Sequence, residues 1–373
     1  MRKFLRKILL KPVLRLSNKY SSKPDKTRIF AALTKLLECI LDGEHKKGLV
    51  VPFDVMTGKF IIFSDQHKGR KNGSDDFLTN EPNYLAALDY YYQQGFHFIA
   101  LGDSEELWEN LVGSVRKAQQ PSFEKEAAFV PNNAFIKIFG NHDLFWDNDP
   151  LAPLQLKEIY GYDIPIYEGI VLQTIVNNKK LNIFCTHGHQ GDAVSDGNWF
   201  SKFFISRIWA PLQAFLRINP NTPAYDASLK TAHNTFMYEW SAQQSDLLLI
   251  TGHTHQPVFE SLTHIERLYR QLLFARKQND ASMIETIQNE IVARKFEHNN
   301  ISEDYLKLKP SYFNSGCCCF DDGDITGIEI SEGVIRLIEW GTEKDTPERY
   351  ILEEMPLVEL LGIATEGNLE TKS

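Results

Sequence analysis

The sequence predicts an α/β fold in which polar, ligand-type residues follow the strands. Five short apolar runs have the length and composition of buried strands, and each ends directly at a polar block. These runs are Lys59–Ser64, Phe96–Leu101, Ala134–Phe139, Leu181–Thr186 and Asp246–Thr251. In open α/β sheets, ligand sites collect beyond the carboxyl ends of the strands, where short loops direct side chains toward one point. We therefore expect the five loops to converge on a single site.

The five polar blocks carry the donor atoms that bind first-row divalent metal ions. In chain order they are Asp65-Gln66-His67, Gly102-Asp103, Gly140-Asn141-His142-Asp143, His187 and Gly252-His253-Thr254-His255. Carboxylate oxygens, an amide oxygen and imidazole nitrogens together can hold two such ions side by side. One block alone usually marks a turn or a structural histidine, but five in this order are hard to obtain by chance. The blocks predict a two-metal enzyme.

The ordered series D-x-H, G-D-x-x-[D/E], G-N-H-[D/E], H-G and G-H-x-H resembles the calcineurin-like metallophosphoesterase superfamily, over residues 58 to about 340. The resemblance implies a four-layer αββα sandwich of two mixed sheets with helical cap insertions, and hydrolysis of a phosphate ester or anhydride. It also implies two divalent metal ions, with Mn favoured and Fe or Zn as alternatives. The implied ligands are Asp65, His67 and His255 for the first ion, Asn141, His187 and His253 for the second, and Asp103 as the bridge.

The resemblance also implies a mechanism. Two Lewis acids would lower the pKa of a bridging water, and the resulting hydroxide would attack phosphorus in line. His142 matches the family histidine that protonates the leaving oxygen or stabilises the transition state. Glu106, at a position where many members carry Asp, is the expected orienting carboxylate, with Asp143 as the alternative. His189 is either a contact of the ligands or substrate, or a loop hydrogen-bonder.

The second and third blocks point to different subfamilies. Glu106-Leu107-Trp108 continues a G-D-x-x-[D/E]-x-W pattern similar to the bacterial UDP-2,3-diacylglucosamine hydrolases, which cleave a pyrophosphate at a membrane surface. Those enzymes usually have G-N-R-D in the third block, where this chain has His142, as phosphatases and general phosphodiesterases do. We expect a phosphodiester or pyrophosphate substrate, with a small phosphorylated or lipid-linked compound as the partner. The alternatives are a phosphomonoesterase or protein serine/threonine phosphatase and, in another class, a non-catalytic scaffold, against which the intact ligand set argues.

The expected catalytic domain, residues 51–362, contains two insertions. The first, about 195–243, has aromatic residues at helical spacing and would form a cap over the metals or pack as ordinary core. The second, about 262–300, is typical of a solvated helical hairpin. Strands near 326–330, 334–340 and 350–352 would complete the second sheet, and residues 363–373 would form a polar tail.

A segment similar to the family's N-[S/T]-G motif follows the second insertion. Tyr312–Gly316 is therefore expected near the metals, as that motif is in many relatives. We expect Cys317, Cys318 and Cys319 to continue it as a strand with a structural role, because three adjacent cysteines cannot all face one metal.

Charge is unevenly distributed along the 373 residues, whose net charge is −9. Residues 1–28 contain ten Lys or Arg and one Asp, so the remainder is strongly acidic and no nucleic-acid partner is expected. Residues 1–50 are predicted to be a basic amphipathic arm and a helix over Thr27–Asp42. Residues 1–20 would contact an anionic membrane surface peripherally, or lie across the body.

The cysteine content predicts a reducing compartment. Five cysteines, without framework spacing or a signal peptide, favour the cytoplasm, with peripheral attachment to the inner face of the membrane. The sequence leaves the oligomeric state open.

Overall fold

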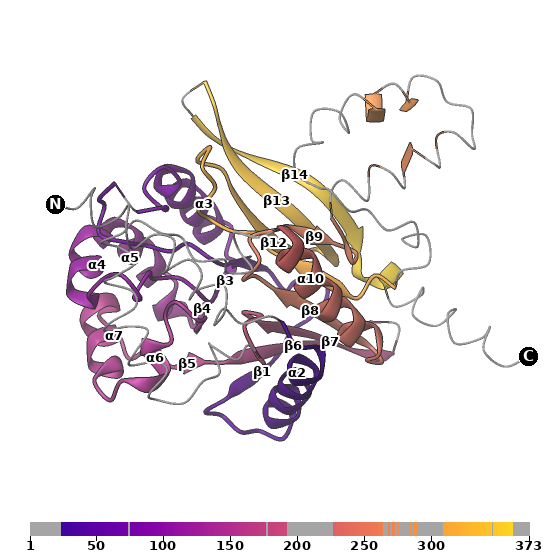
Figure 1. Cartoon of the computed structure of the whole chain (residues 1–373), viewed down its shortest axis with the longest axis horizontal. Helices are drawn as coiled ribbons and strands as arrows, with labels where there is room; N and C mark the ends of the chain where they lie inside the picture. The colour runs from indigo at the N-terminus through magenta and orange to yellow at the C-terminus, as the bar shows by residue number, and fades with distance from the viewer. Residues whose placement is uncertain are drawn as a thin grey trace, which may run out of the picture.

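The structure is a computed structural model that describes residues 24–73, 75–176, 178–191, 227–263, 309–344 and 346–360, with isolated residues between 268 and 288. Two seven-stranded mixed sheets form its centre (Figure 1). The first sheet has the order β1 (Gly48–Pro52), β6 (Gly169–Val176), β7 (Lys179–Thr186), β8 (Leu247–Thr251), β11 (Tyr312–Asn314), β9 (Val258–Phe259) and β10 (Leu262–Thr263). The second has the order β14 (Thr346–Pro356), β13 (Val334–Glu343), β12 (Ile325–Ser331), β2 (Phe60–Phe63), β3 (His97–Leu101), β4 (Phe135–Ile138) and β5 (Ile166–Tyr167).

The four-layer arrangement follows from the alternation of side chains along the strands. In β2, Phe60 and Ile62 join the core between the two sheets, whereas Ile61 and Phe63 pack outward beneath α3 (Glu81–Gln93). Since successive strand residues point to opposite faces, a strand that is apolar throughout must be covered on both sides. The predicted α/β sandwich of two mixed sheets is confirmed.

Two helices form the outer layer on the outward face of the first sheet. α2 (Lys26–Leu41) and α10 (Ala227–Ala242) pack together against the outward residues of β6, β7 and β8 (Figure 1). The Asp25 side chain caps α2, with Oδ1 accepting a hydrogen bond from Arg28 N at 2.9 Å. Trp240 Nε1 donates to Thr34 Oγ1 at 3.0 Å and joins the two helices. The helix expected over Thr27–Asp42 is thus α2.

Four further helices pack beside the second sheet, namely α4 (Val112–Ala118), α5 (Gln120–Ala127), α6 (Phe145–Asn148) and α7 (Ala152–Tyr160). A short 3₁₀ turn, η1 (Val130–Asn132), precedes β4. The apolar residues of α4, α5, α6 and α7 form a separate cluster around Phe123, Trp146 and Tyr160. No helix within the described ranges is long and apolar enough to cross a membrane.

Several expectations from the sequence fall on residues that the structure does not describe. The basic arm, the first part of the 195–243 insertion and the polar tail lie outside the described residues. In the second insertion, the described residues Leu268, Leu272, Ala275 and Ile287 contact one another in a small apolar cluster. The cap and the membrane contact therefore stay predictions. The part of the first insertion that forms α10 lies in the outer helical layer rather than apart from the body.

The structure corrects one strand. Cys317, Cys318 and Cys319 do not continue β11; they form an irregular connection that leaves the first sheet and enters the second at β12. The strand expected at 350–352 extends over the whole of β14, which pairs with β13 along its length across a register shift at Leu337/Ile338.

A network of buried charges lies beneath the loops that carry the ligand blocks. The Lys68 ammonium contacts Glu126 and lies 3.4 Å from Glu105 Oε1, and Lys137 Nζ donates to Glu105 Oε1 at 3.0 Å. All four side chains are buried. Trp146 Nε1 donates to Glu105, and Tyr84 and Tyr160 each donate a hydroxyl hydrogen bond to Glu126. The two lysines balance the charge of the two glutamates, and the Trp and Tyr side chains donate further hydrogen bonds to the carboxylates. Charged groups in a dry interior need both kinds of partner.

Replacing one cation of this network should cost far more stability than replacing an exposed one. Lys68→Met leaves Glu105 and Glu126 buried with one cation fewer, so we expect a loss of about 3–5 kcal/mol in the free energy of unfolding. The matched control is Lys125→Met, because Lys125 pairs with Asp89 and its side chain is 41% exposed; its loss should be below about 1 kcal/mol. Urea unfolding of the metal-free proteins measures both values, and equal losses would contradict the structural role of the network.

Candidate metal centre

The ligand blocks meet where the carboxyl ends of parallel strands from both sheets face one another. β2, β3 and β4 are neighbouring parallel strands in the second sheet, and β7, β8 and β11 are neighbours in the first. The loops after β2 and β3 run side by side, with Asp65 N donating to Gly102 O at 3.0 Å and His67 N to Asp103 O at 2.9 Å. The topology therefore brings five segments, far apart in the sequence, to one point.

The residues predicted to hold the first ion lie together. His255 Nε2 is 3.2 Å from both Asp65 Oδ1 and His67 Nε2, and His67 Nε2 is 3.8 Å from Asp103 Oδ2. Two ligands bound to one ion at about 2.1 Å, at angles near 90–110°, lie roughly 3.0–3.4 Å apart. The shorter of these distances match that separation, so one cation fits between the three side chains.

The residues predicted to hold the second ion lie on the other side of Asp103. His187 Nε2 is 3.1 Å from Asp103 Oδ2 and 3.3 Å from Asn141 Oδ1. A nitrogen of His253, one of His187 and an oxygen of Asp103 all lie within 4.8 Å of one another. Asp103 thus stands between the two groups, which is where a bridging carboxylate is needed to screen two cations from each other.

Three of the ligands, Asp65, Asp103 and His187, each have one polar atom bound to the protein and another directed to the centre. Oδ2 of Asp65 accepts a hydrogen bond from His253 N at 2.9 Å, and Oδ1 of Asp103 accepts one from His142 N at 2.7 Å. Nδ1 of His187 lies 2.9 Å from Leu101 O, a carbonyl that can only accept, so the ring donates from Nδ1. The lone pair of a neutral His187 then occupies Nε2 and faces the acceptor oxygens of Asp103 and Asn141. Facing acceptors without a proton or metal between them repel.

Two buried atoms at the centre have no hydrogen-bond partner among the described residues, Asp65 Oδ1 and His253 Nε2. A buried polar atom without a partner costs free energy, and a ligand position is an ordinary reason for one. The donor set of carboxylate, amide and imidazole suits Mn, Fe or Zn. The residues therefore fit a dinuclear centre; which ligand binds which ion stays a prediction.

The charges in the centre depend on one another. Burial alone would raise the pKa of Asp65, but His187 and His255 hold it well below its usual value, and His187 and His142 do the same for Asp103. Conversely, Asp103 and Asp65 raise the pKa of His187 to about 9 against the opposing effect of burial. Burial, together with His233 and His187, holds the pKa of His253 well below its usual value, which favours the neutral ring that a metal ligand requires.

The backbone of the centre is unusual. Asp65, His67, Asp103, His253 and His255 all have positive φ, between 49° and 68°. Residues other than glycine rarely adopt this region, at a cost of order 1–3 kcal/mol each, and they collect at functional sites. Close approach also demands glycine, since a Cβ on Gly102 would lie 2.6 Å from the His187 ring and one on Gly140 would overlap Asp103 Oδ1.

His142 lies at the edge of the centre, held by Glu106 and Trp108. Glu106 Oε2 is 2.6 Å from Nδ1 of His142 and 3.1 Å from Nδ1 of His67, so one oxygen contacts both rings. Burial opposes ionisation of Glu106, but the adjacent His142 lowers its pKa to about 2. The Trp108 indole stacks on the His142 ring, with centroids 4.0 Å apart and planes at 16°.

Asp143, the alternative partner of His142, is engaged elsewhere. Its Oδ2 accepts a hydrogen bond from Ser104 N at 2.8 Å, and its Oδ1 accepts one from Gly140 N at 2.5 Å. Burial and the charge of Glu105 raise the pKa of Asp143 to about 6. Asp143 joins the second and third blocks, and Glu106 is the carboxylate that contacts His142.

His189 lies beside the centre, with its ring centroid 5.4 Å from that of His187. It is buried, which places it among the neighbours of the ligands rather than on an exposed loop.

Sequence reasoning missed two residues at the centre, His233 and Cys319, and expected a third, Asn314, near it. His233 on α10 has its ring 5.1 Å from that of His253, and its Nε2 bonds Gly188 O at 2.8 Å. Asn314 Nδ2 donates to Gly252 O at 2.6 Å, which places the N-[S/T]-G segment against the loop of His253 and His255. Cys319 Sγ lies 3.5 Å from His255 Nδ1. The N-[S/T]-G resemblance signals Asn314, whereas no sequence pattern signals His233 or Cys319.

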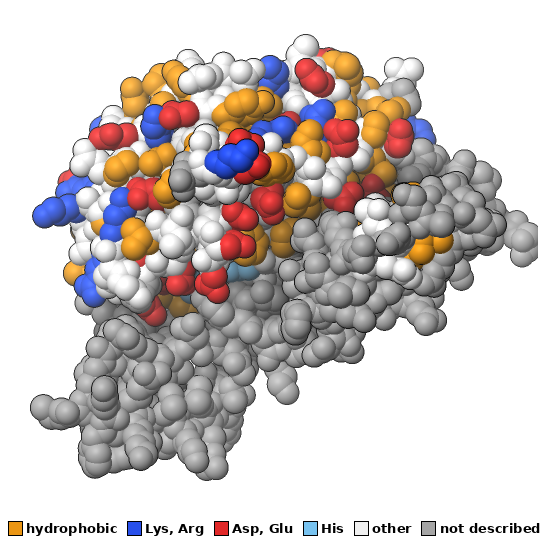
Figure 2. All heavy atoms as spheres, turned by 90° about the horizontal axis from the view of Figure 1, so that it is seen from above, with side chains coloured by type: hydrophobic (Ala, Val, Ile, Leu, Met, Phe, Trp, Pro, Cys, Tyr) orange, Lys and Arg blue, Asp and Glu red, His pale blue; other side chains and the backbone are white. Residues whose placement is uncertain are grey.

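The surface near the centre is acidic. Figure 2 shows Asp and Glu side chains gathered beside the visible histidine. Asp76 and Glu109 lie near the site. Burial raises the pKa of both carboxyl groups, and the charge of Glu106 raises it further. Such a surface attracts cations, as a metal-binding site requires.

A comparison with known protein families finds one match. A family model described as calcineurin-like phosphoesterase matches residues 58–257, more than half of the 373 residues. No curated protein sequence matches the chain.

Solved structures similar to the chain include Vacuolar Protein Sorting 29 from Cryptosporidium parvum, at 10% identity and a TM-score of 0.31, covering 81% of this chain and 99% of that one. A single-substitution variant of Vps29 from Entamoeba histolytica has 12% identity and a TM-score of 0.28, covering 79% and 99%. A dimetal phosphatase from Danio rerio has 8% identity and a TM-score of 0.36, covering 80% and 100%. With TM-scores this low, these structures add nothing to the assignment.

Adding one methyl group at Gly140 should disrupt metal binding without unfolding the protein. In Gly140→Ala the new Cβ overlaps Asp103 Oδ1 and displaces the bridging carboxylate. We expect the affinity for Mn²⁺ to fall at least tenfold, the order seen when the geometry of a metal site is disturbed. The control is Gly113→Ala on α4, where a Cβ meets nothing within 4 Å. Metal titration measures both, and unchanged affinity in Gly140→Ala would contradict the close approach of Gly140 to Asp103.

Proposed function

Because the chain belongs to the calcineurin-like phosphoesterase family, a family of metal-dependent phosphoester hydrolases, we propose that it hydrolyses a phosphodiester or pyrophosphate at a dinuclear metal centre. One observation carries the proposal. The ligand-type atoms of Asp65, His67, Asp103, Asn141, His187, His253 and His255 converge on one buried centre, where carboxylate oxygens lie 3.1 Å and 3.2 Å from imidazole nitrogens. A scaffold without catalysis would have no need to keep this set.

We propose three separate ligands for each ion and one shared ligand. Asp65, His67 and His255 would hold the first, Asn141, His187 and His253 the second, and Asp103 both. When bound, the ions supply an activated water nucleophile and neutralise charge on the phosphoryl oxygens. Mn²⁺ is the metal we propose, because mixed oxygen and nitrogen ligation suits it; Fe and Zn are the alternatives.

His142 is the proposed general acid. Its Nδ1 contacts the ionised Glu106 at 2.6 Å, which keeps a proton on that nitrogen and directs the other ring nitrogen away from Glu106. A proton carried at the second nitrogen can pass to the leaving oxygen. The stacked Trp108 holds the ring plane and places an aromatic surface next to the acid.

For the substrate, we propose a phosphodiester or pyrophosphate that carries an apolar group, such as a lipid-linked compound. The G-D-x-x-[D/E]-x-W pattern around Trp108, which resembles the UDP-2,3-diacylglucosamine hydrolases, and the aromatic insertion near 195–216 support this class. The basic arm supports peripheral contact with the inner face of a membrane. A phosphomonoesterase or protein serine/threonine phosphatase is the second candidate, favoured by His142 at the position where those hydrolases usually carry Arg.

A substrate panel separates these candidates. We expect the Mn²⁺-loaded protein to prefer bis(p-nitrophenyl) phosphate over p-nitrophenyl phosphate, and lipid-linked pyrophosphates over soluble nucleotide conjugates. EDTA should abolish turnover and Mn²⁺ should restore it. Asp103→Asn, the blank, should lose on the order of 10³-fold in kcat, since the bridging charge is removed. Asp89→Asn, a surface carboxylate paired with Lys125, is the matched control and should retain activity. Strong preference for the monoester would overturn the diesterase proposal.

The role of His142 predicts a dependence on the leaving group. His142→Gln should lower kcat about 10²–10⁴-fold for an alkyl ester, whose leaving oxygen needs a proton, with both metal ions retained. The loss should be much smaller for a p-nitrophenyl ester, because p-nitrophenolate leaves without protonation. Steady-state kinetics on the two ester series, with metal analysis, measures this. Equal losses in the two series would show that His142 does not act as the acid.

A further inference from the structure

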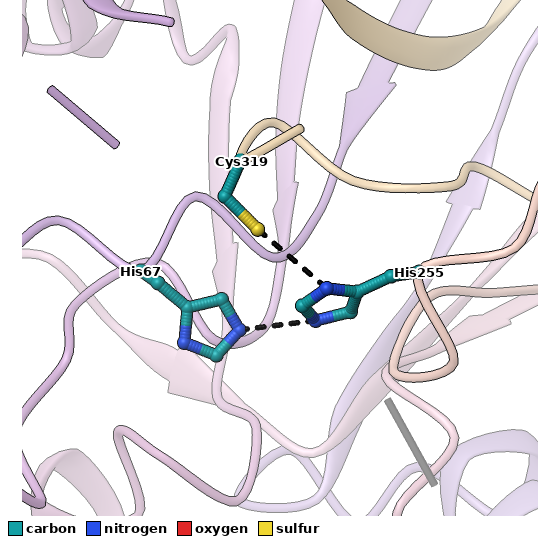
Figure 3. A group of neighbouring side chains, drawn as sticks. All are labelled: His67, His255 and Cys319. Atoms are coloured by element: carbon teal, nitrogen blue, oxygen red, sulfur yellow. Dashed lines mark hydrogen bonds between the residues drawn. The ribbon is translucent and has the colours of Figure 1, made fainter. Parts of the chain in front are cut away.

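A thiol stands behind one of the metal-ligand histidines. In Figure 3, the sulfur of Cys319 is directed at one nitrogen of the His255 ring, and His67 faces the other nitrogen. Cys319 Sγ is 3.5 Å from Nδ1 of His255, while Nε2 of the same ring is 3.2 Å from His67 Nε2 and from Asp65 Oδ1. The ring thus presents one nitrogen to the centre and the other to the sulfur.

A histidine that binds a metal through one nitrogen donates the N–H of the other to an acceptor, which fixes the tautomer and the ring orientation. Two other histidines of the centre follow this rule with oxygen acceptors. His187 uses the Leu101 carbonyl at 2.9 Å, and His67 uses the Glu106 carboxylate at 3.1 Å. For His255, the sulfur of Cys319 lies at hydrogen-bond distance from Nδ1, and the side chain of Cys317 also contacts this ring.

We propose that Cys319 is a positioning residue of the metal centre, whose sulfur accepts a hydrogen bond from Nδ1 of His255 and so directs the Nε2 lone pair of His255 to the first ion. This inference rests on the proposed function, because it needs an ion at that place. It assigns to the third cysteine of the run a role that the sequence had given to none of the three.

Cys318 is placed differently from Cys319, whereas Cys317, which is also buried, lies close to Cys319 and to the His255 ring. Cys318 is fully buried in the apolar cluster with Phe63 and Ile325, on the outer face of the second sheet. Cys319 is partly exposed and belongs to none of the apolar clusters formed by the described residues. Its position is therefore not explained by packing, as that of Cys318 is.

Direct coordination by Cys319 is the competing arrangement. The sulfur, a nitrogen of His67 and a nitrogen of His255 lie within 4.8 Å of one another, so their separation alone would allow a shared ion. However, the sulfur lies nearest Nδ1 of His255, whereas Asp65 and His67 lie at Nε2. An ion held by Asp65, His67 and His255 would therefore bind at Nε2 of His255, whereas the sulfur lies nearest Nδ1.

The test compares three variants of the full chain by chelator competition, which resolves the two metal affinities. Cys319→Ala removes the acceptor, so we expect one of the two affinities to fall about 10–100-fold and the other to stay unchanged. Cys319→Ser retains an acceptor and should recover most of that loss. Cys318→Ala is the matched control, which should keep both affinities. Thermal unfolding of the metal-free proteins verifies that all three fold.

Two spectroscopic readouts separate positioning from packing and from coordination. Long-range ¹⁵N–¹H correlation should show the Nδ1–H tautomer of His255 in the metal-bound wild type, and a mixture of tautomers in Cys319→Ala. The Co²⁺-substituted wild type should lack a sulfur-to-cobalt charge-transfer band. Such a band, lost in Cys319→Ala, would overturn the inference in favour of direct coordination.

The failures of the two proposals are distinguishable. A wild type that binds two ions, with both affinities unchanged in Cys319→Ala, overturns the positioning role and leaves the proposed function intact. A wild type that binds no divalent ion overturns the proposed function itself.

Discussion

Acceptor atoms that face each other across about 3 Å in a dry interior repel unless a cation lies between them, and the rest of the centre is arranged around that repulsion. His187 Nε2 faces Asp103 Oδ2 at 3.1 Å, and His255 Nε2 faces Asp65 Oδ1 at 3.2 Å. The outer atoms of these groups are fixed by the backbone and by neighbouring side chains, so the inner atoms cannot turn away. In the absence of metal, protons on the histidines serve as the cations, as the raised pKa of His187 indicates. Metal binding and proton release are therefore coupled in this centre.

Holding these groups together has a cost that the surrounding fold must offset. Five of the ligands adopt positive φ, and backbone hydrogen bonds between neighbouring loops, from Asp65 N to Gly102 O and from His67 N to Asp103 O, help to hold the chain in this conformation. The Lys68, Glu105, Glu126 and Lys137 network lies beneath the same loops, with Lys68 one residue past His67 and Glu105 two past Asp103. The charges that stabilise the interior are thus covalently next to the residues that hold the metals, so the fold and the site depend on each other.

The sequence predicted those parts of the structure in which a local pattern and a chemical requirement coincide. All five strands that end at a ligand block were found within two residues of their bounds, because a buried strand is apolar throughout and its end is marked by a polar block. β1 and β6 carry no such block and were not identified. The Cys317–Cys319 run was misassigned, because small apolar residues suit a strand or a buried connection equally. The contacts of His233 and Cys319 depend on tertiary packing, which one sequence without chemical motifs at those positions cannot specify.

Glutamate at position 106, where relatives often carry aspartate, has a physical consequence in this structure. Its longer side chain lets a single oxygen, Oε2, contact Nδ1 of both His142 and His67, whose rings are 4.6 Å apart and nearly perpendicular. One carboxylate thereby orients a ligand of the first ion and the proposed acid together. If metal binding changes the charge or position of His67, the change would act on Glu106 and, through Glu106, on His142. Glu106 thus contacts both a proposed ligand of the first ion and the proposed acid, so we expect a change at the first metal site to alter the position of His142.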